Sequence, residues 1–183
     1  YGIAIAAVGM LANTGIQFCL ARKKPNGTFT NGIERKKTTV TSFQDGDSVK
    51  FSSLGGLDAW DPTKYLNVWV CNYDKVDAAG YIFSAYAQFP AGGVDETYGV
   101  VIRYGAVGPY DSTYYRGNGG ILNHELGHCL NLYHIWGDDG VACTGSDNCG
   151  DTPNEAGRTT GKHTGLLTDN CTTTSPGIMY MNF

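Results

Sequence analysis

The chain has no long hydrophobic run, and its apolar stretch near the N-terminus, residues 3–12, is far shorter than the roughly 20 residues that cross a bilayer. No basic segment precedes this stretch and the chain does not begin with methionine, so the stretch does not match a signal peptide. We expect it to pack on the core as a helix or strand, in a mature or excised domain whose targeting segment is missing. No membrane partner is expected.

Charged residues are also scarce, at 16% of 183 residues, and the formal net charge is −4. Lysine and arginine are scattered apart from two short runs, at residues 23–24 and 35–37, which we expect to be exposed. Without a larger basic face, the chain is not expected to bind nucleic acid. With 42% hydrophobic residues, 26 glycines and 12 tyrosines, the composition is typical of one compact, loop-rich globular domain.

Histidine is rare as well, because the chain has four, and three of them lie in the stretch HELGHCLNLYH that begins at His124. His124 and His128 are one helical turn apart, so both side chains project from one face and can reach a single ion. Glu125 follows by about 100° of rotation and therefore flanks the ion without ligating it. The pattern predicts Zn²⁺ held by His124, His128 and His134, with an open position for water and Glu125 as the general base.

The third histidine requires a bend in the chain. His134 comes six residues after His128, which is nearly the opposite side of a straight helix. It can reach the same ion only if the helix ends and the chain turns sharply, with Asn131 as the pivot. Glycine adopts such a left-handed helix end most easily, and asparagine is the next most tolerant residue. The metzincin pattern HExxHxxGxxH has glycine there, so Asn131 is its one departure.

The residues around the histidines predict how this helix packs. Apolar residues recur at helical spacing and should pack on a sheet while the histidines face a cleft; they are Ile121, Leu122, Leu126, Cys129 and Leu130. We interpret Cys129 as a small core residue and not as a catalytic thiol. The fourth histidine, His163, lies in a polar stretch and is expected to be a solvated loop residue.

Four strands are expected before the helix, over residues 14–21, 38–43, 65–71 and 99–104. Turn residues separate the first two, and the strongly apolar third strand should be a central parallel strand buried on both faces. Residues 80–93 contain an aromatic extended piece that ends at Pro90, which suits an edge strand able to pair with an extended peptide. This order favours an α/β fold with a helix-borne site beneath a sheet.

Several stretches resemble the pappalysin family of metzincin zinc metallopeptidases, close to its bacterial, ulilysin-like members. They span most of residues 14–183 and read IQFCLA, TTVTSF, YLNVWVC, YAQFPAGG, GVVIRYGAVG, HELGHCLNLYHIWGD, DTP and IMYMNF. The resemblance implies a secreted or periplasmic-side endopeptidase that acts on protein or peptide substrates. It also implies a metzincin-like mixed, twisted sheet with an active-site helix in a single catalytic domain. We expect an N-terminal lobe over residues 1–134, a partial, loop-rich C-terminal lobe over residues 135–183, and a monomer.

The resemblance further implies a feature that this sequence does not contain. Metzincins have a tight turn with a methionine beneath the zinc, which in this family follows Asn-Phe and precedes a tyrosine. The chain stops at Asn182-Phe183, and neither Met179 nor Met181 has the matching register. We therefore expect a fragment, or a protein whose remainder is a separate piece, that lacks the wall of the S1′ pocket. Zinc binding should survive, and efficient turnover is less assured.

Three cysteines lie in polar loops after the helix, where a small lobe would need a covalent link. By the family resemblance Cys143 pairs with Cys171, and a Cys143–Cys149 bond is the competing option. One cysteine of the three is left over in either case. Cys19 and Cys71 fall in apolar segments and are expected to be core thiols.

An acidic, turn-rich segment at residues 145–155 offers oxygen ligands of the kind that Ca²⁺ prefers. With the resemblance, it predicts a calcium site on Asp147, Asp151 and Thr152. A solvated acidic turn is the alternative. Two other functions also fit the residues: a gluzincin-type peptidase whose third zinc ligand is a downstream acid such as Glu155, and a zinc-binding or interaction domain without useful catalysis.

Overall fold

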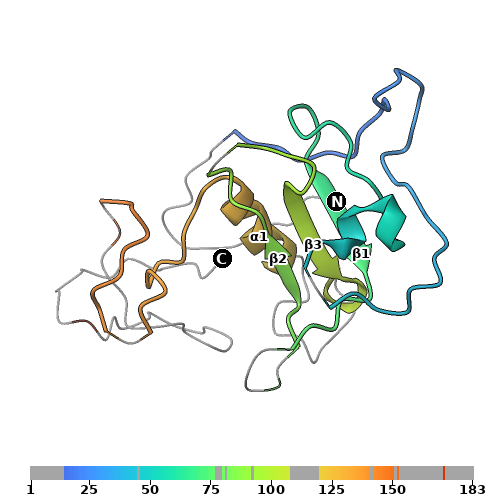
Figure 1. Ribbon diagram of the computed structural model, residues 1–183. Helices are drawn as coiled ribbons and strands as arrows, with labels where there is room; N and C mark the ends of the chain where they lie inside the picture. The colour runs from blue at the N-terminus through green and yellow to red at the C-terminus, as the bar shows by residue number, and fades with distance from the viewer. Residues whose placement is uncertain are drawn as a thin grey trace. The chain divides into compact units, whose positions relative to one another are not determined.

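The computed structural model describes residues 15–44, 46–76, 80, 82–91, 93–107, 120–140, 142–150, 152 and 171. The chain divides into two compact units, residues 1–35 and residues 36–183. The strands and the α-helix of the described residues all lie in the second unit (Figure 1). The segment at residues 3–12 lies outside the described residues, and the division into lobes at residue 134 stays a prediction.

The sheet combines β1 (Asn67–Cys71), β2 (Ala85–Ala87) and β3 (Gly99–Arg103) in the order β1-β3-β2. β3 pairs in parallel with β1 and antiparallel with β2. Its residues Val100, Val101 and Ile102 are fully buried, because apolar layers cover both faces of this strand. The mixed sheet and the edge position of β2, which lies within the extended piece expected at residues 80–93, are both confirmed.

The prediction that the third strand is central is wrong for the described sheet. β1 lies at its edge, and Val68 and Val70 are 41% and 54% exposed. Trp69 between them is buried, so the strand alternates and is not buried on both faces. The physical reason is that helix α1 (Gly120–Cys129) packs on β2 and β3, which leaves the valine face of β1 without that cover.

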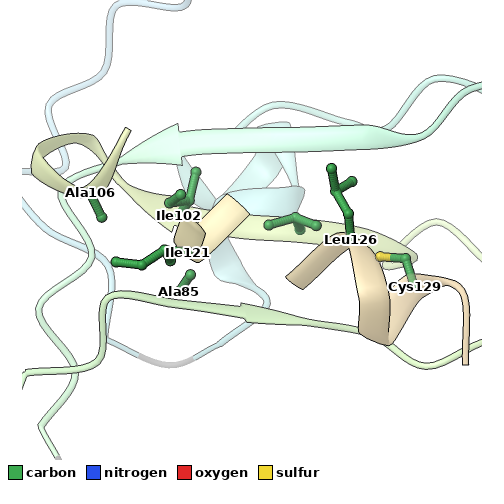
Figure 2. Close-up of a cluster of buried hydrophobic side chains, with 7 residues drawn as sticks. Ala85, Ile102, Ala106, Ile121, Leu126 and Cys129 are labelled. Carbon is green, nitrogen blue, oxygen red and sulfur yellow. The ribbon is translucent and has the colours of Figure 1, made fainter. Parts of the chain in front are cut away.

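The two faces of β3 carry two apolar clusters. On one face Val100 and Ile102 meet α1, and Figure 2 shows Ile121, Leu126 and Cys129 directed at the strands in this cluster. On the other face Val101 packs in a cluster with residues from the segment before β1, from β1 itself and from just after it, namely Phe43, Val49, Trp69 and Tyr73. Because successive side chains of a strand point to opposite faces, one buried strand supports both layers.

The first two strand predictions fail. Residues 15–21 belong to no strand, and Ile16, Phe18 and Leu20 are more than half exposed. Of residues 38–43, only Phe43 pairs, in a single bridge with Tyr73. An alternating apolar segment becomes a strand only where a neighbouring strand accepts its hydrogen bonds, and residues 15–21 meet none in the described part of the chain.

Helix α1 presents the predicted apolar face, with one exception. Ile121, Leu126 and Cys129 are buried and Leu122 is partly buried against the sheet, whereas Leu130 is 49% exposed because it follows the helix end. The interpretation of Cys129 as a core residue is confirmed. None of the helices in the described part of the chain is long and apolar enough to cross a membrane.

Candidate metal centre

Helix α1 ends in a Schellman turn centred on Asn131. The amide of Leu132 donates to the carbonyl of Gly127 over 2.9 Å, and the amide of Asn131 donates to the carbonyl of His128 over 2.9 Å. Asn131 itself is left-handed, with φ of 69°. This pair of hydrogen bonds satisfies carbonyls that the last helical turn leaves free. The predicted bend at Asn131 is confirmed, and the local side-chain bonding of asparagine makes the departure from glycine tolerable.

The bend brings three imidazoles together. The Nε2 atoms of His124 and His128 are 3.0 Å apart, and each lies 3.1 Å from Nε2 of His134. Among the described residues, these three form the group of histidine, cysteine and acidic side chains that is close enough to hold one ion.

The hydrogen bonds behind the rings define their tautomers. Nδ1 of His128 contacts the carbonyl of Leu132 at 2.7 Å, and Nδ1 of His134 contacts Oδ1 of Asp138 at 2.8 Å. Both oxygens can only accept, so both Nδ1 atoms carry the proton and the Nε2 lone pairs point into the triangle. Burial lowers the pKa of His128, which further favours its neutral form.

The donor set fits Zn²⁺. Converging lone pairs repel one another unless a cation lies between them, and neutral imidazole nitrogens are preferred zinc ligands. A tetrahedral zinc ion with bonds of about 2.0–2.1 Å holds its ligand nitrogens roughly 3.3 Å apart, which is close to the observed triangle. The arrangement is the histidine triad typical of metzincins.

Aromatic side chains surround the triad. The ring of Phe89, just after β2, lies 4.9 Å from the rings of both His128 and Tyr133. The indole of Trp136 stacks on the ring of His134 at 4.2 Å with 8° between the planes. A pocket opens here, lined by His124, Gly127, His128, Leu132, Tyr133, His134, Ile135 and Trp136.

Glu125 occupies the helix position next to His124 and is only 7% exposed. The same helix carries Cys129, whose pKa is raised to about 11, mainly by burial and further by the charge of Glu125. The thiol therefore stays protonated at neutral pH and is a poor nucleophile. Glu125 is thus a buried carboxyl group that α1 places next to a histidine of the triad, and its predicted role as the general base stays a prediction.

The residues expected to bind calcium are only partly described. Asp147 is buried, and its Oδ1 accepts a hydrogen bond of 2.9 Å from the amide of Cys149, whose carbonyl accepts from the amide of Thr152. Asp151 lies outside the described residues, as do Glu155 and His163. The calcium site therefore stays a prediction.

The disulfide between Cys143 and Cys171 is confirmed, with its Cα atoms 5.6 Å apart. The prediction that Cys19 is a core thiol is wrong, because this residue is exposed in the segment that failed to pair as a strand. Cys71 is half-buried, and burial raises its pKa to about 11.

Comparison with known proteins agrees with this site. Residues 55–182 match the peptidase family model described as pregnancy-associated plasma protein-A. The chain belongs to this family. It is a pappalysin, within the metzincins, as the motif indicated.

Solved structures show the same fold. Mature mirolysin of Tannerella forsythia, in complex with a cleaved peptide, superposes with a TM-score of 0.80 and is 46% identical, over 93% of this chain and 63% of that chain. A promirolysin mutant of the same organism gives a TM-score of 0.81 at 46% identity, over 93% of this chain and 55% of that chain. The mirolysin-like metzincin fold, with a mixed sheet and a helix that carries the triad, is thereby confirmed.

Curated relatives match a smaller part. Extracellular metalloproteases of Arthroderma otae and Arthroderma benhamiae are both 36% identical over 63 residues, which is 34% of this chain and 23% and 22% of those proteins. The chain thus spans about a quarter of these relatives, and less than two thirds of mirolysin.

Sequence reasoning missed three residues of the site: Phe89, Trp136 and Asp138. The spacing of Asp138, four residues after His134, resembles the helical spacing of paired side chains, but here a turn produces it. Phe89 comes from the segment just after β2, far from the histidines in the sequence, so no local pattern predicts its contact with His128.

Proposed function

We propose that this chain is the catalytic part of a zinc-dependent endopeptidase, with His124, His128 and His134 as the zinc ligands. The observation that carries the proposal is the triangle of Nε2 atoms, 3.0–3.1 Å on each side, with Glu125 adjacent on the same helix. Membership in a family of metallopeptidases supports it.

In this proposal the metal ion and Glu125 have different roles in the hydrolysis of the peptide bond. When bound, the zinc ion lowers the pKa of water toward about 7 and polarises the carbonyl of the scissile bond. Glu125 accepts a proton from the attacking water and delivers it to the amine of the leaving product. Its burial keeps bulk water away from this proton transfer, which strengthens the electrostatic interactions involved.

A protein or peptide substrate would bind as an extended chain beside β2. This strand is at the edge of the described sheet, and the residue two positions after it, Phe89, contacts the ring of His128. An extended peptide paired with such an edge would place its backbone next to the metal centre. Mirolysin is solved in complex with a cleaved peptide, which supports a peptide as the class of substrate.

The test is to replace Glu125 with alanine and to measure both bound zinc and cleavage of an unfolded protein substrate. We expect zinc content to stay at the wild-type level and cleavage to fall by at least about 100-fold, the usual contribution of general acid–base catalysis. His124→Ala is the matched control and should lose zinc as well. Undiminished cleavage by Glu125→Ala would overturn the mechanism.

The second candidate is a zinc-binding domain with impaired catalysis. The chain covers 63% of the mirolysin chain, so residues that shape the floor of the site can lie in the remainder of a longer protein. Cleavage rates of this chain and of the longer protein, compared at equal zinc content, separate the two candidates. Robust cleavage by the short chain excludes the second one.

Three further proposals concern the protein's setting. We propose that it is secreted, since extracellular relatives and a disulfide fit an oxidising compartment. We also propose the calcium site on Asp147, Asp151 and Thr152, which a shift of the unfolding temperature on addition of Ca²⁺ to chelator-treated protein would support, and no shift would refute. That the protein acts as a monomer stays a prediction.

A further inference from the structure

The third histidine of the triad is anchored differently from the other two. His124 and His128 project from α1, whereas His134 follows the helix end in an irregular segment. The Nδ1 partner of His128 is a backbone carbonyl, but the partner of His134 is the carboxylate of Asp138, whose side chain is 62% exposed. His134 is neutral when its Nδ1 donates to this carboxylate, and water competes for a carboxylate so exposed. Asp138 therefore sets the tautomer of His134 but leaves the faces of the ring to other groups.

The indole of Trp136 covers one face of that ring. The two rings are nearly parallel, at 8°, with centroids 4.2 Å apart, whereas the ring of His128 meets His134 edge-on at 82°. An imidazole that shares its lone pair with a metal cation becomes more positive, and the face of an indole is negative. The stack therefore becomes more favourable when a metal binds.

A tight turn holds Trp136 against His134. The amide of Gly137 donates to the carbonyl of His134 over 2.9 Å, which closes the turn, and Gly137 is left-handed with φ of 62°. A loop packs directly behind this turn: a Cβ atom on Gly137 would lie 2.1 Å from the amide nitrogen of Ser146, and one on Gly145 would lie 2.6 Å from the carbonyl oxygen of Trp136.

Asp139 fastens that loop to the turn. Its Oδ2 accepts hydrogen bonds from the amide and the hydroxyl of Thr144, at 2.7 and 2.8 Å, and from the amide of Gly145 at 2.6 Å. The disulfide at Cys143 ties the same loop to Cys171. These bonds hold the backbone around Trp136, whose indole stacks on the ring of His134.

We propose that Trp136 is a positioning residue for the third zinc ligand, which it holds in the orientation that completes the triad. This inference rests on the proposed zinc function. It assigns to the Trp of the His-Ile-Trp-Gly-Asp stretch a role in metal affinity and coordination geometry that is separate from the chemistry of Glu125.

Zinc affinity of the full chain, measured by competition with a chelator, tests the proposal. Trp136→Leu keeps an apolar side chain without a ring, and we expect it to bind zinc about tenfold more weakly, as for loss of other groups that orient metal ligands. Trp136→Phe restores a ring and should recover most of the affinity. Trp60→Phe, at a half-buried tryptophan outside the pocket, is the matched control and should bind as the wild type does.

Two spectroscopic measurements distinguish the loss of the stacked ring from a general change in the structure of the variant. The visible absorption of the cobalt-substituted protein should change in Trp136→Leu and return in Trp136→Phe. In the wild type, Cu²⁺ at the triad should quench tryptophan emission, and this quenching should vanish in Trp136→Phe and persist in Trp60→Phe.

The outcomes distinguish a failure of the proposed zinc function from a failure of the role proposed for Trp136. If the wild type binds no zinc, the proposed function fails and this inference fails with it. If the wild type binds zinc and Trp136→Leu matches it in affinity and cobalt spectrum, only the inference is overturned. Copper quenching that survives Trp136→Phe would also overturn it, and that result does not depend on whether the leucine variant folds.

Discussion

The carbonyl of Leu132 accepts a hydrogen bond of 2.7 Å from Nδ1 of His128, so the turn that ends the helix also orients a ligand of the triad. The same turn makes Asn131 left-handed and sends the chain back toward His134. Helix termination and metal binding therefore depend on the same few backbone angles. A change that alters the turn should affect both.

Asn131 offers the most direct test of this coupling. Asn131→Gly keeps the left-handed angle and should change the free energy of unfolding by less than about 0.5 kcal/mol. Asn131→Val should cost about 1–2 kcal/mol, because a branched side chain collides with the following carbonyl in this conformation. It should also weaken zinc binding, since His134 then leaves the triad. Chemical denaturation and zinc titration measure the two effects.

Leu130→Val is the control for Asn131→Val. Leu130 is the preceding residue, is 49% exposed and is not left-handed, so the same new side chain should have little effect there. Equal losses at both positions would show that the backbone angle at Asn131 is not the cause.

The metal centre was largely predictable from the sequence because its geometry is local. The interval between His128 and His134 requires a helix end and a bend, and few residues tolerate the angle that Asn131 adopts. Trp136 was not predictable in the same way. Its contact with His134 depends on a turn and on the loop behind it, which no periodicity of the sequence encodes.

The strand predictions show where a local sequence pattern is not sufficient. The central strand β3 is a short apolar run between turn residues, and its bounds were nearly correct. The alternating pattern of Ile16, Phe18 and Leu20 equally suits a strand, yet these side chains are exposed. Alternation shows that one face is apolar, but a partner strand decides whether hydrogen-bond pairing follows, and partners are distant in the sequence.

Gly137 and Gly140 form a matched pair for the turn beneath Trp136. Both are left-handed, with φ of 62° and 77°, but a Cβ atom on Gly137 meets the backbone of residues 145–146 whereas one on Gly140 meets nothing within 4 Å. Gly140→Ala should therefore cost about 1 kcal/mol of strain alone. Gly137→Ala should cost roughly 2 kcal/mol more, because packed backbone must move. Urea denaturation of the metal-free protein gives both values, and equal losses would refute the role of the loop.

A buried lysine provides a prediction away from the metal. The ammonium of Lys50 is fully buried, lies 2.7 Å from Oδ1 of Asp47 and donates to the carbonyl of Thr97 over 2.6 Å. The rings of Trp69 and Tyr86 flank it at 5.5 and 4.9 Å. Asp47→Ala should cost about 2 kcal/mol or more, because it leaves a buried charge without its counter-ion.

Lys50→Met should be less damaging than Asp47→Ala, although it removes the more buried residue. Methionine fills similar space, the desolvation cost of the ammonium disappears, and the half-exposed carboxylate of Asp47 returns to water. Midpoints of denaturation for the two variants decide the order. A larger loss for Lys50→Met would mean that the bonds of the ammonium outweigh the cost of burying it.

The lowered pKa of His128 predicts how the metal-free protein responds to acid. Burial is the main cause, so the folded state binds a proton at this residue less readily than the unfolded state, whose pKa is near 6.5. Between about pH 6.5 and the lowered pKa, unfolding therefore takes up a proton. The free energy of unfolding falls as the pH falls through this range. Urea denaturation at several pH values between 7.5 and 5 measures the slope. His128→Gln should be less stable at all of them but show a smaller slope, and an unchanged slope would show that His128 does not contribute the effect.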